Sequence, residues 1–171
     1  MRPAKFLEKV LTARVYDVAR ETPLDHMSRI SRRLGNRVWL KREDLQPVFS
    51  FKCRGAFNKI YRELQSNPEL TGVITASAGN HAQGVALSAK KLGIEATIVM
   101  PTTTPDIKVS AVKAYGAKVL IKGDNFDAAK DFSLDLAEKE GLAFIHPFDD
   151  IDVIAGQGTI AHEIIRQHPD K

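Results

Sequence analysis

A lysine and a polar turn containing glycine are the residues of this chain whose types and spacing suggest chemistry. Lys52 lies in the run S-F-K-C-R-G-A (50–56), and the run S-A-G-N-H-A-Q-G (77–84) begins 25 positions later. A partly buried lysine favours the neutral amine, which can attack an aldehyde to form a Schiff base. A turn at a helix start offers free N–H groups to an anion. Together they predict an enzyme that holds an aldehyde cofactor and binds a substrate carboxylate.

Each of these features also has a structural interpretation. A lysine at a helix start is most often a surface charge, although Phe51 and Ala56 predict partial burial for Lys52. The 77–84 run is also compatible with an ordinary turn in which Gly79 relieves backbone strain and Asn80 is the N-cap. Cys53 is either a reactive thiol or a small buried one, and we favour the buried thiol.

The elements that must position these residues follow from hydrophobic periodicity. We expect buried strands at 73–76, 97–100, 118–121 and 142–145, separated by helical segments around 82–89, 107–115 and 126–136. Gly93, Gly116 and Gly141 stand where helix C-caps belong, and Asp124 where an N-cap belongs. Such short strand–helix–strand units predict an α/β fold, a three-layer unit around a parallel sheet.

The flanking regions have different patterns. We expect helices at 5–20 and 24–34, the second ending at Gly35, then a strand at 37–41 and a loop at 43–49. Ser50 is expected to cap a helix that runs to about residue 64. The last segment, 153–167, is expected to start with a glycine-rich entry at 155–159 before it becomes helical.

Composition narrows the function classes. Of the 171 residues 43% are hydrophobic, and the apolar runs are far shorter than the roughly 20 residues that span a bilayer. With one cysteine and no signal-peptide core we expect a cytoplasmic protein without membrane contact. His81 and His162 lack partners at metal-ligand spacing, so no metal is expected. Residues 1–42 carry eleven Lys/Arg against four Asp/Glu. Without interleaved aromatic residues, this favours a solvated or subunit-facing surface over nucleic-acid binding.

The chain resembles the fold-type-II pyridoxal-phosphate enzymes, and within them the biosynthetic threonine dehydratases (threonine ammonia-lyases). The resemblance rests on runs that occur in the same order over nearly the whole chain. They are T-P-L (22–24), K-R-E-D (41–44), S-F-K-C-R-G-A (50–56), T-A-S-A-G-N-H-A-Q-G-V-A (75–86), M-P (100–101) with D-I-K (106–108), H-P-F-D (146–149) and V-I-A-G-Q-G-T (153–159).

The resemblance implies a site and a reaction. Lys52 is the lysine that would bind pyridoxal 5'-phosphate as a Schiff base, Phe51 would pack beside the cofactor ring, and Asn80 would hydrogen-bond its phenolic oxygen. The substrate α-carboxylate would bind at Ser77, Ala78, Gly79, Asn80 and His81. The implied lyase reaction is elimination from L-threonine to 2-oxobutanoate and ammonia, as in isoleucine biosynthesis, and from L-serine to pyruvate. For this chemistry the Lys52 amine must face the turn at 77–81.

The resemblance also implies a tryptophan-synthase-β-like arrangement of two domains. Residues 1–53 would begin a large cofactor domain, 54–151 would form the small α/β domain, and 152–171 would return to the large domain. The family's tetraglycine phosphate loop and pyridine-nitrogen partner do not lie within residues 1–171. We therefore expect a truncated sequence that is inactive alone, from an enzyme that is a dimer or tetramer at full length.

Two alternatives remain. The chain is also similar to serine dehydratases and serine racemases of the same fold type. The racemases carry a serine where Ala78 stands, so Ala78 disfavours racemisation. The alternative of another class is a non-catalytic α/β module that binds an amino acid or a partner protein. Lys52 argues against that module, because pure binding gains nothing from a buried amine.

Overall fold

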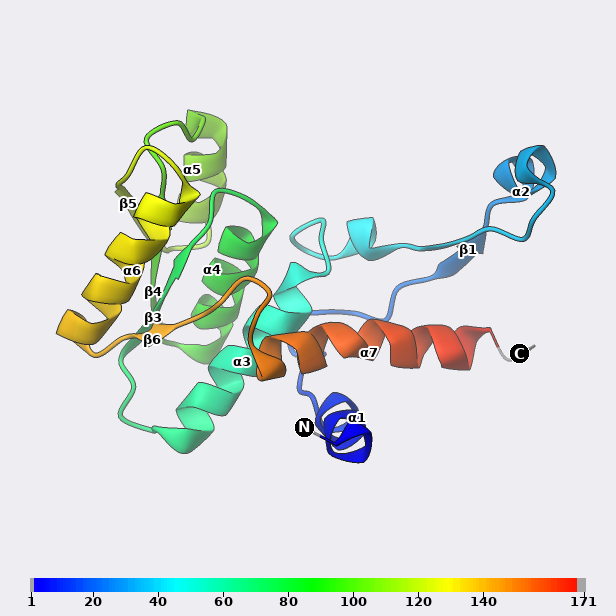
Figure 1. Cartoon of the computed structure of the whole chain (residues 1–171), viewed down its shortest axis with the longest axis horizontal. Coiled ribbons are helices and arrows are strands. Elements are labelled where there is room, and N and C mark those ends of the chain that lie inside the picture. The colour runs from blue at the N-terminus through cyan, green and yellow to red at the C-terminus, as the bar shows by residue number, and fades with distance from the viewer. Residues whose placement is uncertain (1, 169–171) are drawn as a thin grey trace.

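The chain folds as three layers around a parallel sheet (Figure 1). The computed structural model describes residues 2–168. Its four-stranded sheet has the order β5-β4-β3-β6. One apolar cluster packs α3, α4 and α5 on one face of this sheet, and a second packs α6 on the other. The predicted three-layer α/β fold is confirmed.

The strand–helix alternation from residue 72 agrees with the prediction. The strands are β3 (Gly72–Ala76), β4 (Glu95–Met100), β5 (Lys118–Ile121) and β6 (Ala143–Phe144), and the helices are α4 (Asn80–Leu92), α5 (Asp106–Lys113) and α6 (Phe126–Glu140). In the parallel register Ile74 is opposite Thr97 and Val99 is opposite Leu120. Because parallel strands end at a common edge, the loops after β3 and β6 meet there.

Of the four caps predicted for these helices, two are confirmed and two are wrong. Gly93 and Gly141 are left-handed C-caps, with φ of 73° and 66°. Gly116 is also left-handed, with φ of 88°, but it lies beyond the C-cap of α5, Ala114. The prediction of Asp124 as the N-cap of α6 is wrong. Asn125 fills this position and accepts a hydrogen bond from the Ala128 amide at 3.0 Å.

The first 35 residues depart most from the prediction. The first helix, α1 (Pro3–Leu11), is much shorter than the expected 5–20. The chain leaves the helix because the Arg14 amide bonds the Asn58 side chain at 2.9 Å, a tertiary contact that replaces a helical one. The expected helix at 24–34 is instead the strand β1 (Leu24–His26) followed by α2 (Ser28–Leu34), which ends at Gly35 as predicted. β1 pairs antiparallel with β2 (Trp39–Lys41).

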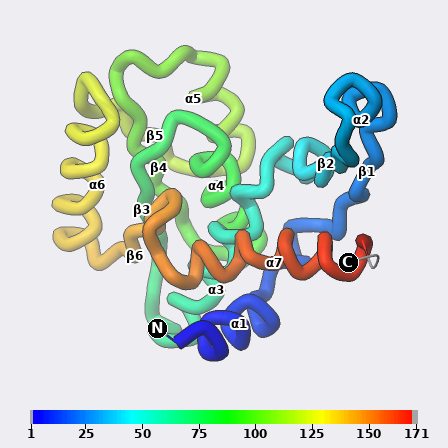
Figure 2. Tube along the Cα trace, turned by 45° about the vertical axis from the view of Figure 1, so that its right-hand side comes forward, coloured from blue at the N-terminus to red at the C-terminus, as the bar shows by residue number. Residues whose placement is uncertain are grey.

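Two long helices, α3 and α7, pack against each other beside the four-stranded sheet. The predicted helix after Ser50 is α3 (Lys52–Ser66), preceded by the short 3-10 helix η1 (Glu43–Leu45). The predicted glycine-rich entry at 155–159 is wrong, because α7 (Ile151–Gln167) is already helical there and is capped by Asp150. α7 packs against both α3 and α1, and Figure 2 shows the three helices close together. Because α3 packs against both α4 and α7, it joins the four-stranded sheet and its helices to the remainder of the structure. The division into domains at 53/54 and 151/152 stays a prediction.

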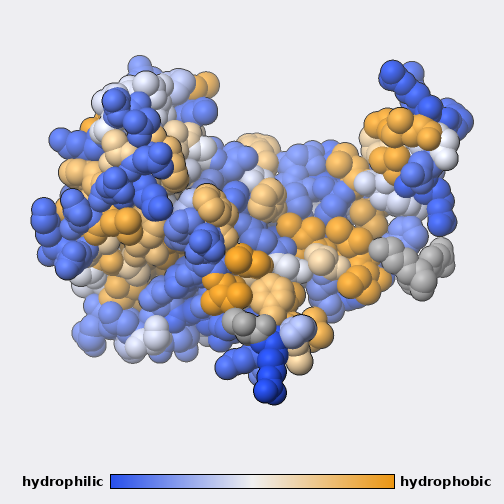
Figure 3. Space-filling model, in the orientation of Figure 1, coloured by the Kyte–Doolittle hydropathy of each residue, from blue (hydrophilic) through white to orange (hydrophobic). Residues whose placement is uncertain are grey.

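Apolar side chains are exposed along α1 and α7. Leu7, Leu11, Ile154 and Ile165 are each at least 40% exposed. Figure 3 shows apolar side chains gathered over this part of the molecule, whereas the surface around the four-stranded sheet is mostly hydrophilic. Within residues 2–168, no helix has the length and apolar character needed to cross a bilayer.

Candidate active site

Lys52 is the first residue of α3. The N-cap, Phe51, makes no side-chain capping bond. The prediction of Ser50 as the cap of this helix is wrong, because Phe51 fills the N-cap position. Ser50, one position earlier, accepts the Lys52 amide through its Oγ at 3.3 Å. The Ser50 carbonyl accepts the Cys53 thiol at 3.5 Å. The start of α3 is therefore held by few local bonds.

The Lys52 amine is partly buried and bonded to a neutral acceptor. Its Nζ donates to the Pro147 carbonyl oxygen at 2.7 Å and lies 5.4 Å from the centre of the Phe51 ring. Among residues 2–168 no carboxylate forms an ion pair with it. Burial lowers the pKa of this amine from its ordinary value. Both features favour the neutral amine that a Schiff base requires.

The turn at 77–81 lies between β3 and α4 and presents free N–H groups. Ser77 Oγ accepts the Gly79 amide at 3.3 Å. Across the described chain, the N–H groups of Ala78, Asn80 and His81 find no acceptor. Gly79, not Asn80, is the N-cap, and its φ of −137° is extended, so no left-handed turn requires glycine there. Asn80 is exposed at the first helical position. The positive end of α4 is thus open to an anion.

His81 is buried in the first turn of α4. Its Nε2 lies 3.1 Å from the Ile145 carbonyl oxygen, while Nδ1 is buried without a partner in the described structure. Burial, assisted by the nearby charge of Lys52, lowers the pKa of His81 to about 4. The ring is therefore neutral at neutral pH, with Nε2–H donating to Ile145.

The loop after β6 joins these two groups, and sequence reasoning missed its role. The Ile145 carbonyl also accepts the Thr75 hydroxyl at 2.7 Å, and Pro147 supplies the acceptor for Lys52. His146 Nδ1 accepts the amides of Phe148 and Asp149 at 3.3 and 2.8 Å, which fixes the loop. The H-P-F-D run (146–149) was visible in the sequence. However, the acceptors for Lys52 and His81 are backbone carbonyls, which every residue has, so no residue type signalled them.

The first turns of α3 and α4 lie against each other. A Cβ on Gly84 would lie 3.1 Å from the carbonyl carbon and oxygen of Lys52. Cys53, the next residue of α3, is fully buried in an apolar cluster with Val15 and Val48. Burial raises the pKa of its thiol to about 11, as expected for an inert buried cysteine.

The residues present fit an aldehyde cofactor. The amine of Lys52 has only a neutral partner, and the adjacent turn offers N–H donors to a carboxylate. No group of three or more His, Cys, Asp or Glu side chains within residues 2–168 is arranged to hold a metal ion. A separate hollow of about 380 Å³ lies between the β1–β2 pair and the end of α7, lined in part by Trp39 and His168. It does not include the Lys52 site.

Comparison with known proteins agrees with this geometry. Residues 15–171 match the family described as pyridoxal-phosphate dependent enzymes. The biosynthetic L-threonine dehydratase of Pasteurella multocida is 56% identical over 165 residues, which are 96% of this chain and 32% of that protein. The chain thus spans about a third of the length of this curated relative.

Two solved structures show the same fold. The processed form of threonine deaminase isoform 2 from Solanum lycopersicum has a TM-score of 0.92 and 54% identity, covering 98% of this chain and 46% of that one. Maize serine racemase has a TM-score of 0.89 and 34% identity, covering 95% and 50%. By sequence and by fold, the chain belongs to the family of pyridoxal-phosphate dependent enzymes.

Proposed function

We propose that the enzyme containing this sequence deaminates L-threonine to 2-oxobutanoate and ammonia, and L-serine to pyruvate. The observation that carries the proposal is the partly buried Lys52 amine, bonded to a carbonyl, with its backbone against α4. The identity to threonine dehydratases, above 50%, supports threonine as the substrate. Each relative's substrate is known for that protein, and we extend it to this chain as part of the proposal.

The proposed roles follow from position and chemistry. Lys52 would hold the cofactor, and its neutral amine would take the α-proton of the substrate. The cofactor, when bound, supplies an electron sink for the negative charge left on that carbon. Phe51 would pack beside the ring, and Asn80, which is exposed at the helix start, would bond the ring's phenolic oxygen.

The substrate carboxylate binds at residues 77–81 in this proposal. The free N–H groups at the start of α4 and the helix dipole favour a negative charge there. Neutral His81 adds no positive charge to this site, so the backbone amides do most of the binding. We further propose a cytoplasmic homo-oligomer as the working form.

The decisive test is Lys52→Ala in the whole enzyme, because alanine cannot form the Schiff base. We expect loss of the visible absorbance of the protein-bound Schiff base and a fall in threonine deamination on the order of a thousandfold or more. The matched control is Lys90→Ala, an exposed lysine in the last turn of α4, which should leave both unchanged. Deamination that survives in Lys52→Ala would reject the proposal.

The alternative of a non-catalytic binding module makes a different prediction. Such a module would bind threonine as tightly with Lys52→Ala as without it, and pyridoxal phosphate would not change the affinity. Calorimetric titration with threonine, in the presence and absence of the cofactor, separates the two functions.

A further inference from the structure

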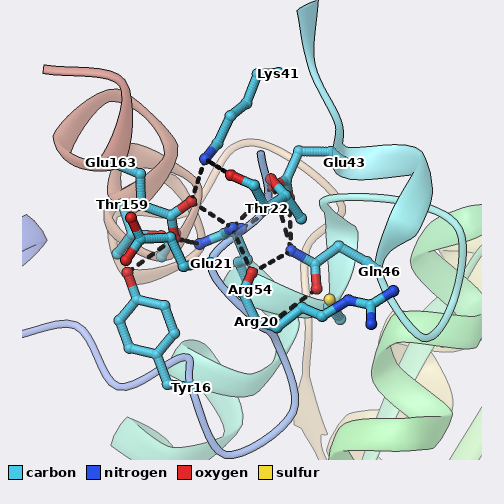
Figure 4. Close-up of polar contacts among 12 residues, drawn as sticks. Tyr16, Arg20, Glu21, Thr22, Lys41, Glu43, Gln46, Arg54, Thr159 and Glu163 are labelled. Carbon is cyan, nitrogen blue, oxygen red and sulfur yellow. Dashed lines mark hydrogen bonds and ion pairs between the residues drawn. The ribbon is translucent and has the colours of Figure 1, made fainter. Parts of the chain in front are cut away.

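Four charged side chains form a buried cluster near the start of α3. They are Lys41, Glu43, Arg54 and Glu163, and we call them the ion cluster. Arg54 and Glu163 have no exposed surface, and the side chains of Glu43 and Lys41 are 11% and 8% exposed. Two cations balance two carboxylates. Figure 4 shows their side chains converging from separate segments of the chain.

Arg54 is held by carboxylates on two sides. Its Nε and Nη2 donate to the two oxygens of Glu43, both at 2.8 Å. Its Nη1 and Nη2 donate to the two oxygens of Glu163 at 2.6 and 3.0 Å. Thr159 Oγ1 and the Arg20 carbonyl accept further bonds, both at 3.1 Å. Two paired contacts of this kind fix the plane as well as the position of a guanidinium group.

The cluster fastens the N-terminal segment to α3 and α7. Lys41 Nζ lies 2.6 Å from Glu163 Oε2, and Tyr16 donates to Glu163 Oε1 at 2.8 Å. The Thr22 hydroxyl donates to Glu43 Oε1 at 2.6 Å. These partners come from residues 16–43, whereas Arg54 belongs to α3 and Glu163 to α7 (Figure 4). The cluster therefore joins three parts of the chain that are distant in sequence.

Arg54 acts on the first turn of α3, which the helix itself holds weakly. The N-cap of α3 contributes no side-chain bond, and uncapped first turns tend to fray. Lys52 and Arg54 are two residues apart, so their side chains leave the helix about 200° apart, on opposite sides. The turn is thus held from the Lys52 side by α4 and from the Arg54 side by the ion cluster.

We propose that the ion cluster is a positioning device. Through Arg54 it fixes the first turn of α3 and thereby holds the Lys52 amine against the Pro147 carbonyl, beside the first turn of α4. Stability alone does not account for the cluster, because apolar side chains of similar size often replace buried ion pairs without loss. The catalytic importance of this positioning rests on the proposed function, but the positioning itself can be measured without it.

The test is Arg54→Lys in the whole enzyme with the cofactor removed. Lysine keeps the positive charge but cannot make the paired contacts to both carboxylates. The measurement is competitive chemical labelling of lysines as a function of pH, read for Lys52 by peptide mass mapping. As the turn loosens and water reaches the amine, we expect the Lys52 profile to move upward by about half a pH unit. This leaves about threefold less neutral amine at a given pH.

Arg62→Lys is the matched control on the same helix, since Arg62 donates to Thr12 near the surface and lies outside the ion cluster. It should leave the Lys52 profile unchanged. A folded Arg54→Lys enzyme with an unchanged Lys52 profile overturns the proposal, even if its unfolding midpoint falls, because the cluster would then serve stability alone.

If Arg54→Lys does not fold, Tyr16→Phe decides the question, since it removes one hydrogen bond to Glu163 and leaves every charge in place. A shift of the Lys52 profile in the same direction supports the proposal, and an unchanged profile overturns it. This readout needs neither cofactor nor turnover. A failure of the proposed function would appear only in the Lys52→Ala assay and is distinguishable.

Discussion

At the scale of one residue, we propose that Ala78 favours elimination over racemisation. Racemisation requires a proton donor on the face of the substrate opposite the lysine, and a methyl group has no proton to give. We expect the whole enzyme to convert L-serine to pyruvate without D-serine at a comparable rate. Chiral chromatography of the products measures both at once. D-serine formed as fast as pyruvate would show that another residue supplies the second proton.

His81 makes a pH prediction with a definite sign. Burial lowers the pKa of its imidazole from 6.5 to about 4, so between these values the unfolded chain binds a proton that the folded chain does not. Stability therefore rises with pH in this window, is fully present above pH 6.5, and is lost as the pH falls toward 4. The shift corresponds to about 3 kcal/mol at most.

His81→Gln isolates this effect, because the glutamine amide can still donate to the Ile145 carbonyl but does not titrate. We expect the free energy of unfolding, measured with urea, to fall more for the parent chain than for the variant between pH 6.5 and pH 4. His162→Gln on α7 is the control and should retain the acid loss of the parent. Parallel pH profiles for the parent and His81→Gln would contradict the assignment.

At the scale of elements, the α3–α7 crossing depends on the absence of a side chain at Gly156. A Cβ there would lie 2.6 Å from the Arg54 carbonyl oxygen and 2.8 Å from the Gly55 Cα, which are backbone atoms that cannot rotate away. Overpacking costs about 1–3 kcal/mol, and we expect the upper end for Gly156→Ala. Since alanine favours the helix by about 1 kcal/mol, the net loss should be about 1–2 kcal/mol.

Gly158→Ala is the matched control in the same helix. Its added methyl would meet the Val10 side chain, at 2.8 Å, and α1 can shift more easily than the packed backbone of α3. Urea unfolding of both variants gives the comparison, and we expect the smaller loss from Gly158→Ala. An equal loss would mean that the α3–α7 contact has as much freedom to move as the α1–α7 contact.

The elements differ in how far the sequence could predict them. The four strands from Val73 onward carry short apolar runs, and their helices carry a matching period, so local pattern was sufficient. The prediction for the region before Gly35 was wrong because tertiary contacts set its structure. β1 is formed by pairing with β2, and the chain after α1 is held by a hydrogen bond to Asn58. The glycines of α7 indicated a loop, whereas they serve a close helix crossing.

The same reasoning explains which parts of the candidate site were visible. Lys52 and the turn at 77–81 each have a recognisable local run, and the structure places their helix starts against each other. The ion cluster had no local signal, since Glu43, Arg54 and Glu163 look like ordinary surface charges until the chain folds. Buried charges far apart in sequence are found only through their partners.

At the scale of the whole molecule, the curated relative in Pasteurella multocida is about three times as long as this chain. The apolar side chains of Leu7 on α1 and Ile165 on α7 are well exposed. Exposed apolar area of this kind in a soluble protein usually marks an interface. In α7, burial raises the pKa of Glu163, but hydrogen bonds from Arg54, Lys41 and Tyr16 outweigh burial and lower it, so protonation of Glu163 at low pH also costs stability.

The 171-residue chain by itself is expected to bind pyridoxal phosphate weakly and not to turn over threonine. One reversible imine at Lys52 gives little affinity in water unless other groups hold the phosphate and the ring, and residues 1–171 contain no tetraglycine run of the kind that the resemblance implies for the phosphate. Visible absorbance after addition of the cofactor, with threonine deamination measured in parallel, compares the chain with the whole enzyme. The Lys52→Ala form of the same chain corrects for imines at surface lysines. If the 171-residue chain shows the Schiff-base absorbance at Lys52 and deaminates threonine, its residues form a complete site and this prediction is wrong.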